Sequence, residues 1–303
     1  MKNLSVHLTD TCNNSCIFCV VGSHVGTPEK VNRKLVYEFL RENKDGGFEF
    51  VNLHGGEPTL LEEFPDIIRM IKELGYPNIS VQTNGRMLSN MDFARQTVND
   101  GVNLCVISLH GHTKELQDYF TEIDKSFEEA VQGIKNVVSL GCKVRTNTCV
   151  CKQNYTQLAD IVRFSMSLGV SHINISNLHT AGNCLKNFDL VVPKLSDAIP
   201  YVKEAVDACV EAGVKVTLEG YPMCVLGDYA KYLIDWEENQ FKMLYKSFVF
   251  KNYNTFMETS AKTKGDICKN CAKNKICGGV YKEYADAYGF DEMIPEIKEK
   301  NVG

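Results

Sequence analysis

The sequence predicts an α/β protein built on a parallel β-sheet, and three observations favour this fold class. Six strand-like runs alternate with five helix-like stretches along the first part of the chain. Glycines stand at the ends of several helix-like stretches, where a left-handed cap terminates a helix. The 303 residues are 44% hydrophobic, which suffices for one large core or for a core with a small appendage. Such alternation favours right-handed βαβ units and therefore parallel strands.

The predicted elements follow one another in order along the chain. The strand-like runs contain apolar and β-branched residues and lie near residues 4–8, 48–54, 78–83, 102–109, 142–150 and 171–176. The helix-like stretches lie between them, near residues 32–43, 62–74, 90–99, 126–140 and 154–168. The expected helix caps are Gly75, Gly101, Gly141 and Gly169.

Two of these strands place polar side chains on one face. In CVISLHG, Ser108 and His110 share a face because side chains alternate along a strand. In CKVRTNTCVC, Arg145, Asn147 and Cys149 share a face, and the opposite face carries mostly β-branched residues. We expect the polar faces to point into the interior of the fold and the β-branched face to pack on helices.

The last third of the chain departs from this alternation. A helical stretch near residues 194–212 precedes the strand VKVTLEG, a long insert and the cysteine-rich segment GDICKNCAKNKICGG. The sequence therefore predicts two domains, with the sheet in residues 1–212 and a small cysteine-rich domain in residues 213–303.

Composition excludes several classes of function. A net charge of -5 and a pI near 5.9 do not indicate the excess of basic residues that nucleic-acid binding requires. No apolar run approaches the ~20 residues that span a bilayer, and the N-terminus has no secretory core. The thirteen cysteines group in metal-ligand spacings, which indicates a reducing compartment. We expect a cytoplasmic protein that binds neither nucleic acid nor membrane.

The most informative motif is the C-x3-C-x2-C loop formed by Cys12, Cys16 and Cys19 in DTCNNSCIFCVV. Iron–sulfur cubes normally take four thiolates, so three ligands on one loop leave one iron open for chemistry. The spacing alone also allows a zinc knuckle, with His7 or His24 as the fourth ligand.

A second motif narrows this choice. Gly55-Gly56-Glu57-Pro58 closes the second predicted strand, and glycines there let the backbone approach a ligand closely. Together with the cysteine loop, in which Phe18 completes C-x3-C-x-aromatic-C, this motif resembles the radical S-adenosylmethionine (SAM) superfamily. A zinc knuckle does not explain GGEP.

The resemblance implies a partial (β/α)6 TIM-like barrel, open on one side, with its site at the carboxyl ends of the strands. It also implies a [4Fe-4S] cluster on the three cysteines and SAM as cofactor, with Glu57 adding charge beside the SAM ammonium. The residues that it assigns to SAM binding are Phe18, Gly55, Gly56, Glu57, Asn84, Ser108 and Asn147. His110 could contact substrate, or it could be a hydrogen-bonded turn residue before Gly111.

The C-terminal cysteines resemble the auxiliary-cluster domain of the SPASM and twitch branch of the superfamily. C-x2-C-x5-C with one cysteine upstream implies a second, fully ligated [4Fe-4S] cluster on Cys224, Cys268, Cys271 and Cys277. The same four thiols could form a zinc ribbon. Most of the other cysteines are expected to be small buried residues. Cys149 and Cys184 are the two that we place near the substrate, as candidate hydrogen-atom donors.

The resemblance implies reductive cleavage of SAM to a 5'-deoxyadenosyl radical, which abstracts hydrogen from a substrate. Our first hypothesis is oxidative modification of a ribosomally made peptide, with flavodoxin or ferredoxin as electron donor. Against a peptide, the chain starts almost directly at the first strand, which leaves no room for a leader-binding domain. The alternatives are a small-molecule enzyme of cofactor, sugar or nucleoside biosynthesis, and a peptide epimerase with a cysteine hydrogen donor. A non-catalytic electron carrier is a third class, which GGEP argues against. The substrate, the oligomeric state and the oxidative or redox-neutral outcome stay open.

Overall fold

The computed structural model describes residues 2–234 and 240–297. Within them, nine strands form one sheet in the order β7-β6-β5-β4-β3-β2-β1-β8-β9. The strands are β1 (Lys2–His7), β2 (Phe50–His54), β3 (Asn78–Thr83), β4 (Leu104–Ser108), β5 (Lys143–Val150), β6 (His172–Asn177), β7 (Lys215–Glu219), β8 (Gln240–Tyr245) and β9 (Phe248–Phe250).

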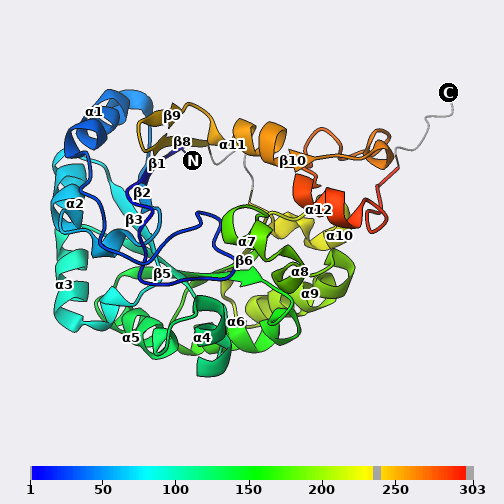
Figure 1. Cartoon of the computed structure of the whole chain (residues 1–303), viewed down its shortest axis with the longest axis horizontal. Coiled ribbons are helices and arrows are strands. Elements are labelled where there is room, and N and C mark those ends of the chain that lie inside the picture. Colours follow the sequence, from blue (N-terminus) through cyan, green and yellow to red (C-terminus); the bar gives the residue numbers. More distant parts are fainter. Residues whose placement is uncertain (1, 235–239, 298–303) are drawn as a thin grey trace.

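The sheet is parallel from β7 to β8, and only β9 runs antiparallel to its neighbour. Figure 1 shows the strands curving into an open barrel with most helices on its outer side. The predicted α/β class and partial TIM-like barrel are confirmed. All six predicted strands occur within two residues of their expected bounds, because each has the alternating pattern of a strand between turn residues.

The helices that cover the sheet agree closely with the sequence-based expectation. The five predicted ones are α1 (Arg33–Asn43), α2 (Phe64–Glu73), α3 (Met91–Asp100), α5 (Ser126–Ser139) and α6 (Leu158–Ser167), and the later α9 spans Leu195–Glu211. The four glycines expected to cap helices all have positive φ. The sequence analysis missed α4 (Lys114–Thr121), a short helix that Thr113 caps by accepting a hydrogen bond from the backbone of Leu116.

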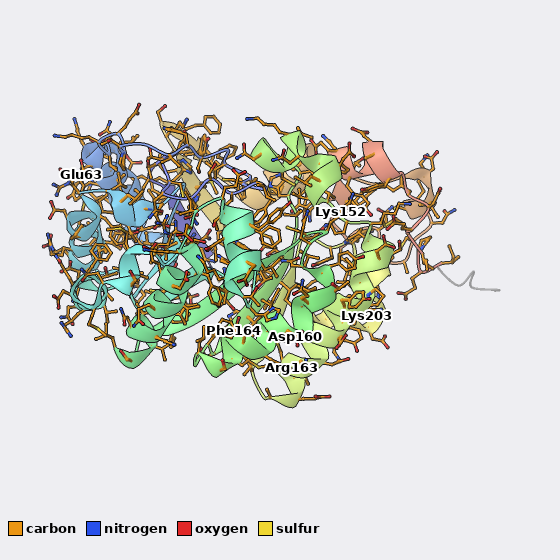
Figure 2. All side chains as sticks on the ribbon, turned by 60° about the horizontal axis from the view of Figure 1, so that its bottom comes forward. Glu63, Lys152, Asp160, Arg163, Phe164 and Lys203 are labelled. Atoms are coloured by element: carbon orange, nitrogen blue, oxygen red, sulfur yellow. The ribbon has the colours of Figure 1, made fainter. Side chains whose placement is uncertain are left out.

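The apolar core lies between the outer face of the sheet and the helices. On α2 the buried residues are Phe64, Ile67, Ile68 and Ile71, which recur at helical spacing. The outward faces of the helices are polar, and Figure 2 shows Asp160 and Arg163 of α6 pointing away from the sheet. Among the described residues, no helix has both the length and the apolar character needed to cross a membrane.

The predicted division at residue 212 does not coincide with the end of the sheet. β7 pairs with β6 and β8 pairs with β1, so strands from beyond residue 212 extend both sides of the barrel sheet. The physical reason is visible in β7, where Val216 and Leu218 are buried like the alternating residues of the earlier strands. Residues 235–239 and 298–303 of the predicted second domain lie outside the described residues.

The rest of the C-terminal part is small and irregular. It contains α10 (Met223–Leu226), α11 (Tyr253–Phe256), α12 (Lys282–Tyr288), and the antiparallel pair β10 (Lys262–Thr263) and β11 (Val280–Tyr281). In Figure 1 these elements lie at one end of the barrel, near α7 (Gly182–Lys186) and α8 (Phe188–Val191).

Candidate active site

The three N-terminal cysteines lie on one loop that follows β1 at the carboxyl edge of the sheet. The loop closes on itself, because the Cys12 backbone N–H donates to the backbone carbonyl of His24 at 3.0 Å. The backbone N–H of Ile17 donates to the carbonyl of Phe120 at 3.0 Å, which holds the loop against α4. All thirteen cysteines are free thiols, including the three of this loop.

The loop already offers hydrogen bonds to sulfur. The backbone N–H of Asn14 donates to Cys12 Sγ at 3.3 Å, and Asn84 Nδ2 approaches the same sulfur at 3.7 Å. Burial raises the pKa of the Cys12 thiol to about 11, and the charge of Glu57 adds to this effect. Burial also raises the pKa of Cys16, and the nearby Cys19 and Cys12 raise it further. Three mutually close thiols of this kind need a cation to become thiolates, and an iron–sulfur cluster fits them.

The Gly55-Gly56-Glu57 turn packs backbone to backbone against this loop. The Gly56 N–H donates to the carbonyl of Thr9 at 2.6 Å, and the Glu57 N–H donates to the carbonyl of Thr11 at 2.8 Å. A Cβ at Gly56 would lie 2.2 Å from the Thr11 oxygen, and Gly55 has a φ of 140°. The two glycines are therefore required by the close approach of two backbone segments.

The Glu57 side chain is fully buried, and its carboxylate accepts hydrogen bonds from neighbouring residues of the chain. Its carboxylate accepts hydrogen bonds from the Thr59 hydroxyl at 2.6 Å, the Thr83 hydroxyl at 2.7 Å and the Asn84 N–H at 2.7 Å. Burial raises its pKa, and these donors oppose that effect. In the structure the carboxylate ties the end of β2 to the end of β3, and the expectation that Glu57 adds charge beside an ammonium stays a prediction.

Sequence reasoning missed several residues that fix the cysteine loop. Arg86 donates to the Asn13 carbonyl and, at 3.0 Å, to Asn14 Oδ1, and it forms an ion pair with Glu129 at 2.5 Å. On the other side, Asn183 of α7 donates to the carbonyls of Cys19 and Cys16 at 2.8 and 3.1 Å. The only sequence signal was the position of these residues just after strands β3 and β6, where sites of such folds form.

Phe18, which lies on the loop between Cys16 and Cys19, packs against His110. Their rings meet edge to face with centroids 4.8 Å apart, and both side chains are buried. His110 Nδ1 accepts a hydrogen bond from the Cys149 backbone N–H at 3.1 Å, and burial lowers the pKa of His110 to about 4. A neutral, hydrogen-bonded histidine is consistent with a residue that stabilises the turn, and contact of His110 with substrate stays a prediction.

The polar face of β5 is arranged as the alternation predicts. Ser108 of β4 is in register with Asn147 of β5, and both are partly buried. Asn147 Oδ1 accepts from Asn174 Nδ2 at 2.7 Å and from Ser176 Oγ at 2.8 Å. Neighbouring strands thus present a polar, partly accessible surface to the barrel interior, next to the cysteine loop.

The two candidate hydrogen donors both pack into the hydrophobic core, with Cys184 fully buried and Cys149 partly buried. Burial raises the pKa of both the Cys149 and the Cys184 thiol to about 12, and Cys184 raises the pKa of Cys149 further. Cys149 in turn raises the pKa of Cys16. Because Cys184 is on α7, which contacts the cysteine loop through Asn183, both thiols belong to the same region as the N-terminal motif.

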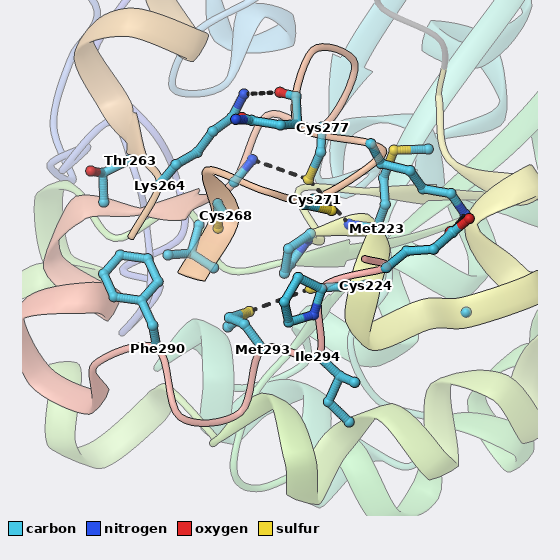
Figure 3. Close-up of a pocket in the computed structure, with 18 residues that line it drawn as sticks. Met223, Cys224, Thr263, Lys264, Cys268, Cys271, Cys277, Phe290, Met293 and Ile294 are labelled. Carbon is cyan, nitrogen blue, oxygen red and sulfur yellow. Dashed lines mark hydrogen bonds and ion pairs between the residues drawn. The ribbon is translucent and has the colours of Figure 1, made fainter. Parts of the chain in front are cut away.

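The four C-terminal cysteines line a single cavity of about 180 Å³, together with Phe290 and Met293. Figure 3 shows Cys224, Cys268, Cys271 and Cys277 around this space. Cys277 Sγ accepts backbone N–H groups from Met223 and Gly279, each at 3.4 Å. Such N–H···S contacts are typical of cluster ligands and tune a cluster's potential.

Comparison with known proteins identifies the family. A profile of the radical SAM superfamily matches residues 6–165, more than half of the chain. The chain belongs to the radical SAM superfamily.

A probable GTP 3',8-cyclase of Saccharolobus islandicus (strain M.14.25 / Kamchatka #1) is 30% identical over 183 residues, 60% of this chain and 58% of the relative. One of Sulfurisphaera tokodaii is 29% identical over 208 residues, 68% of this chain and 65% of the relative. The chain thus spans less than two thirds of the length of these curated relatives.

Solved structures support the same fold over more of the chain. Streptococcus suis SuiB bound to its precursor peptide SuiA superposes with a TM-score of 0.65 at 18% identity, covering 92% of this chain and 71% of SuiB. Native anSMEcpe with bound AdoMet and the Cp18Cys peptide gives a TM-score of 0.64 at 13% identity, covering 98% of this chain and 92% of anSMEcpe. This radical SAM fold supports a [4Fe-4S] cluster and SAM as cofactors of the chain.

Proposed function

We propose that this radical SAM protein reductively cleaves SAM and uses the 5'-deoxyadenosyl radical to abstract hydrogen from a substrate in the barrel. The observation that carries this proposal is the packing of the Gly55-Gly56 turn on the loop of Cys12, Cys16 and Cys19. A [4Fe-4S] cluster on these three thiolates supplies an open iron for the SAM amine and carboxylate, and the electron that cleaves the sulfonium.

The residues of the chain then have distinct tasks. The backbone of Gly55 and Gly56 is placed to bind the methionyl amine, while Glu57 holds that turn rigid through its buried hydrogen bonds. Ser108 and Asn147 contact SAM from β4 and β5, and Phe18 of the loop packs against His110. Asn84 orients the loop by donating to Asn13 at 2.6 Å.

The C-terminal quartet holds a second [4Fe-4S] cluster, as in the SPASM and twitch branch. Two features support this assignment: the four thiols share one cavity, and Cys277 accepts two N–H···S contacts. The same four thiols could instead form a zinc ribbon, with four sulfurs about 2.3 Å from one ion. We assign residues 262–297, with Cys224, to this auxiliary-cluster unit.

Replacing Cys268 and Cys271 together by alanine should remove about four irons per chain, the content of one cube, and most of the turnover. SAM binding should persist, because within residues 2–234 and 240–297 none of the hydrogen bonds of the N-terminal loop involves Cys268 or Cys271. Iron analysis and equilibrium dialysis with labelled SAM measure the two effects. One zinc per chain in anaerobically purified wild-type protein would contradict the assignment.

Two substrate classes are favoured by different observations. Oxidative modification of a ribosomal peptide is supported by the fold likeness to SuiB and anSMEcpe, solved with peptides, which extends over 92% and 98% of the chain. A small-molecule substrate is supported by the sequence relatives named probable GTP 3',8-cyclase. The thirteen free thiols are consistent with a cytoplasmic protein. Flavodoxin or ferredoxin would supply the electron for SAM cleavage.

The mass of the product distinguishes the oxidative outcome from a redox-neutral one. A second cluster has no obvious task in a redox-neutral reaction, so we expect the product to lose two hydrogens. If Cys149 or Cys184 instead returns a hydrogen atom, the product keeps its mass in water and gains one unit in deuterium oxide, and one electron from the flavodoxin or ferredoxin donor with one proton from solvent restores the thiol from its thiyl radical. The Cys149→Ala or Cys184→Ala variant would then form 5'-deoxyadenosine without completing the product. Mass spectrometry of products made in both solvents decides between these outcomes.

A further inference from the structure

The auxiliary-cluster unit exposes large apolar side chains directly beside its cysteines. Ile267 precedes Cys268 and is 43% exposed, and Ile276 precedes Cys277 and is 63% exposed. A single exposed isoleucine is ordinary on a protein surface. Two of them beside ligands of one site are a pattern that calls for a physical reason.

The segment that follows α12 places an exposed isoleucine at each of the other two cysteines. The backbone of Ile294 hydrogen-bonds to Cys224, and its side chain, which is 77% exposed, points away from the sulfurs in Figure 3. Ile297 forms an isolated antiparallel bridge with Cys271 and is 65% exposed. All four cysteines of the unit therefore have an exposed isoleucine beside them, and exposed apolar side chains that gather in this way mark interaction sites.

The same part of the chain is strongly basic. Residues 262–277 contain five lysines and one acidic residue, whereas the whole chain has a net charge of -5. Lys264 and Lys273 line the cavity of the four cysteines. Lys269 and Lys275 are solvent-exposed. Positive charge is thus concentrated around the auxiliary cysteines of an otherwise acidic protein.

These lysines remain available to a partner. Lys269 pairs with Asp266 at 2.7 Å and Lys273 pairs with Glu296 at 3.0 Å, and both carboxylates are exposed. Exposed pairs of this kind are weak, so a carboxylate of another protein can replace that of the chain. Within residues 2–234 and 240–297, Lys275 forms no ion pair.

We propose that this surface of the auxiliary-cluster unit docks a small acidic electron-transfer protein, which takes up the electron that leaves the auxiliary cluster. The isoleucines form the apolar centre of the contact and the lysines its positive rim. Small, transient interfaces are usual for electron-transfer partners, and a unit of this size can provide one. A second copy of this chain fits less well, because a two-fold contact would set the same lysines against one another.

The electron step changes no bond. The auxiliary cluster is oxidised by one electron, and the redox centre of the partner is reduced by one electron. The inference rests on the proposed function, because the auxiliary cluster supplies this electron. The docking itself requires only the surface, so it can be measured without turnover.

The test is anaerobic titration calorimetry of the reconstituted protein with oxidised flavodoxin, an acidic one-electron carrier, at about 0.05 and 0.3 M salt. Wild-type protein should bind, and its Kd should rise with salt because opposite charges attract across the contact. Lys275→Glu should raise the Kd about 3- to 10-fold at the lower salt concentration, the size of two exposed charge interactions. Ile276→Ser should raise it about 10-fold at both salt concentrations, since an apolar side chain is no longer buried on docking.

The matched controls are Lys34→Glu on α1 and Val210→Ser on α9. The Lys34 side chain is 84% exposed and Val210 is 49% exposed, and Figure 1 shows α1 at the opposite end of the molecule from the auxiliary-cluster unit. Both controls should bind flavodoxin like wild type. Iron analysis should give the wild-type content for all four variants, which shows that the cysteine sites are intact.

Unchanged Kd values in both Lys275→Glu and Ile276→Ser, or failure of wild-type protein to bind flavodoxin at the lower salt concentration, would overturn the inference. Sedimentation velocity of the protein alone tests the other occupant. A dimer that Ile276→Ser dissociates would show that a second copy covers this surface, and the inference would be wrong. The titrations do not depend on SAM cleavage, so the absence of 5'-deoxyadenosine from wild type would count against the proposed function alone.

Discussion

Replacing Cys12, Cys16 and Cys19 together by alanine should abolish 5'-deoxyadenosine formation and leave about four irons per chain, against about eight in wild type. The three thiols are the cluster ligands that leave an iron open, and the loop that carries them is held by backbone contacts that do not involve sulfur. The variant should therefore fold. Iron analysis after anaerobic reconstitution and chromatography of the reaction mixture measure the two quantities.

The control for this experiment is Cys209→Ala, a substitution on α9 at a buried cysteine outside both cysteine groups. It should keep the full iron content and SAM cleavage. A triple variant that retains the wild-type iron content would show that the cluster is held elsewhere, and our assignment of the site would be wrong.

Gly56→Ala should have the next largest effect, because its Cβ would lie 2.2 Å from the Thr11 oxygen and 2.7 Å from the Thr11 carbonyl carbon. Both neighbours are backbone atoms of the cysteine loop, so the loop or the turn has to move. We expect a loss of up to about 3 kcal/mol in the free energy of unfolding, the usual range for overpacking, together with loss of SAM binding. Urea unfolding and equilibrium dialysis with labelled SAM check the two effects.

Gly26→Ala is the matched control for Gly56→Ala. Gly26 has no positive φ, and the nearest atom to its Cβ would be His24 Cδ2 at an ordinary 3.7 Å. This variant should bind SAM and unfold like wild type. If Gly56→Ala also behaved like wild type, the close packing of the turn on the cysteine loop would not be what forms the site.

The part of the fold that local pattern controls could be predicted from the sequence. In β5 the alternation of Val144, Thr146 and Thr148 with Arg145 and Asn147 gave the strand, its buried face and its interior face, and the burial pattern agrees. The glycine after each of four helices gave their ends, because only a left-handed residue closes those turns without strain.

The parts that depend on distant pairing could not be predicted. β8 joins the sheet beside β1, more than 200 residues earlier in the chain, and no local pattern encodes that partner. The hydrogen bonds of the Glu57 carboxylate were also not predicted, because its donors Thr83 and Asn84 come from the end of the next strand. Arg145 was placed on the correct face, but only the structure reveals that its Nε has no partner.

The cysteine spacing predicted the family from the N-terminal site, but it did not determine which metal the C-terminal site binds. For the N-terminal loop, C-x3-C-x2-C and GGEP together indicated the family that the profile match establishes. For the C-terminal quartet, the structure places all four thiols around one cavity. Four cysteines serve both zinc and iron–sulfur clusters, so spacing alone does not choose the metal.

The central claim is that this chain cleaves SAM by radical chemistry at the N-terminal cysteine loop. The most direct test is chromatography with mass spectrometry of wild-type protein, anaerobically reconstituted, reduced with dithionite and incubated with SAM. We predict release of 5'-deoxyadenosine and methionine in equal amounts. Protein that holds its full iron content yet releases no 5'-deoxyadenosine, with dithionite or with reduced flavodoxin, would contradict the claim and indicate an electron carrier.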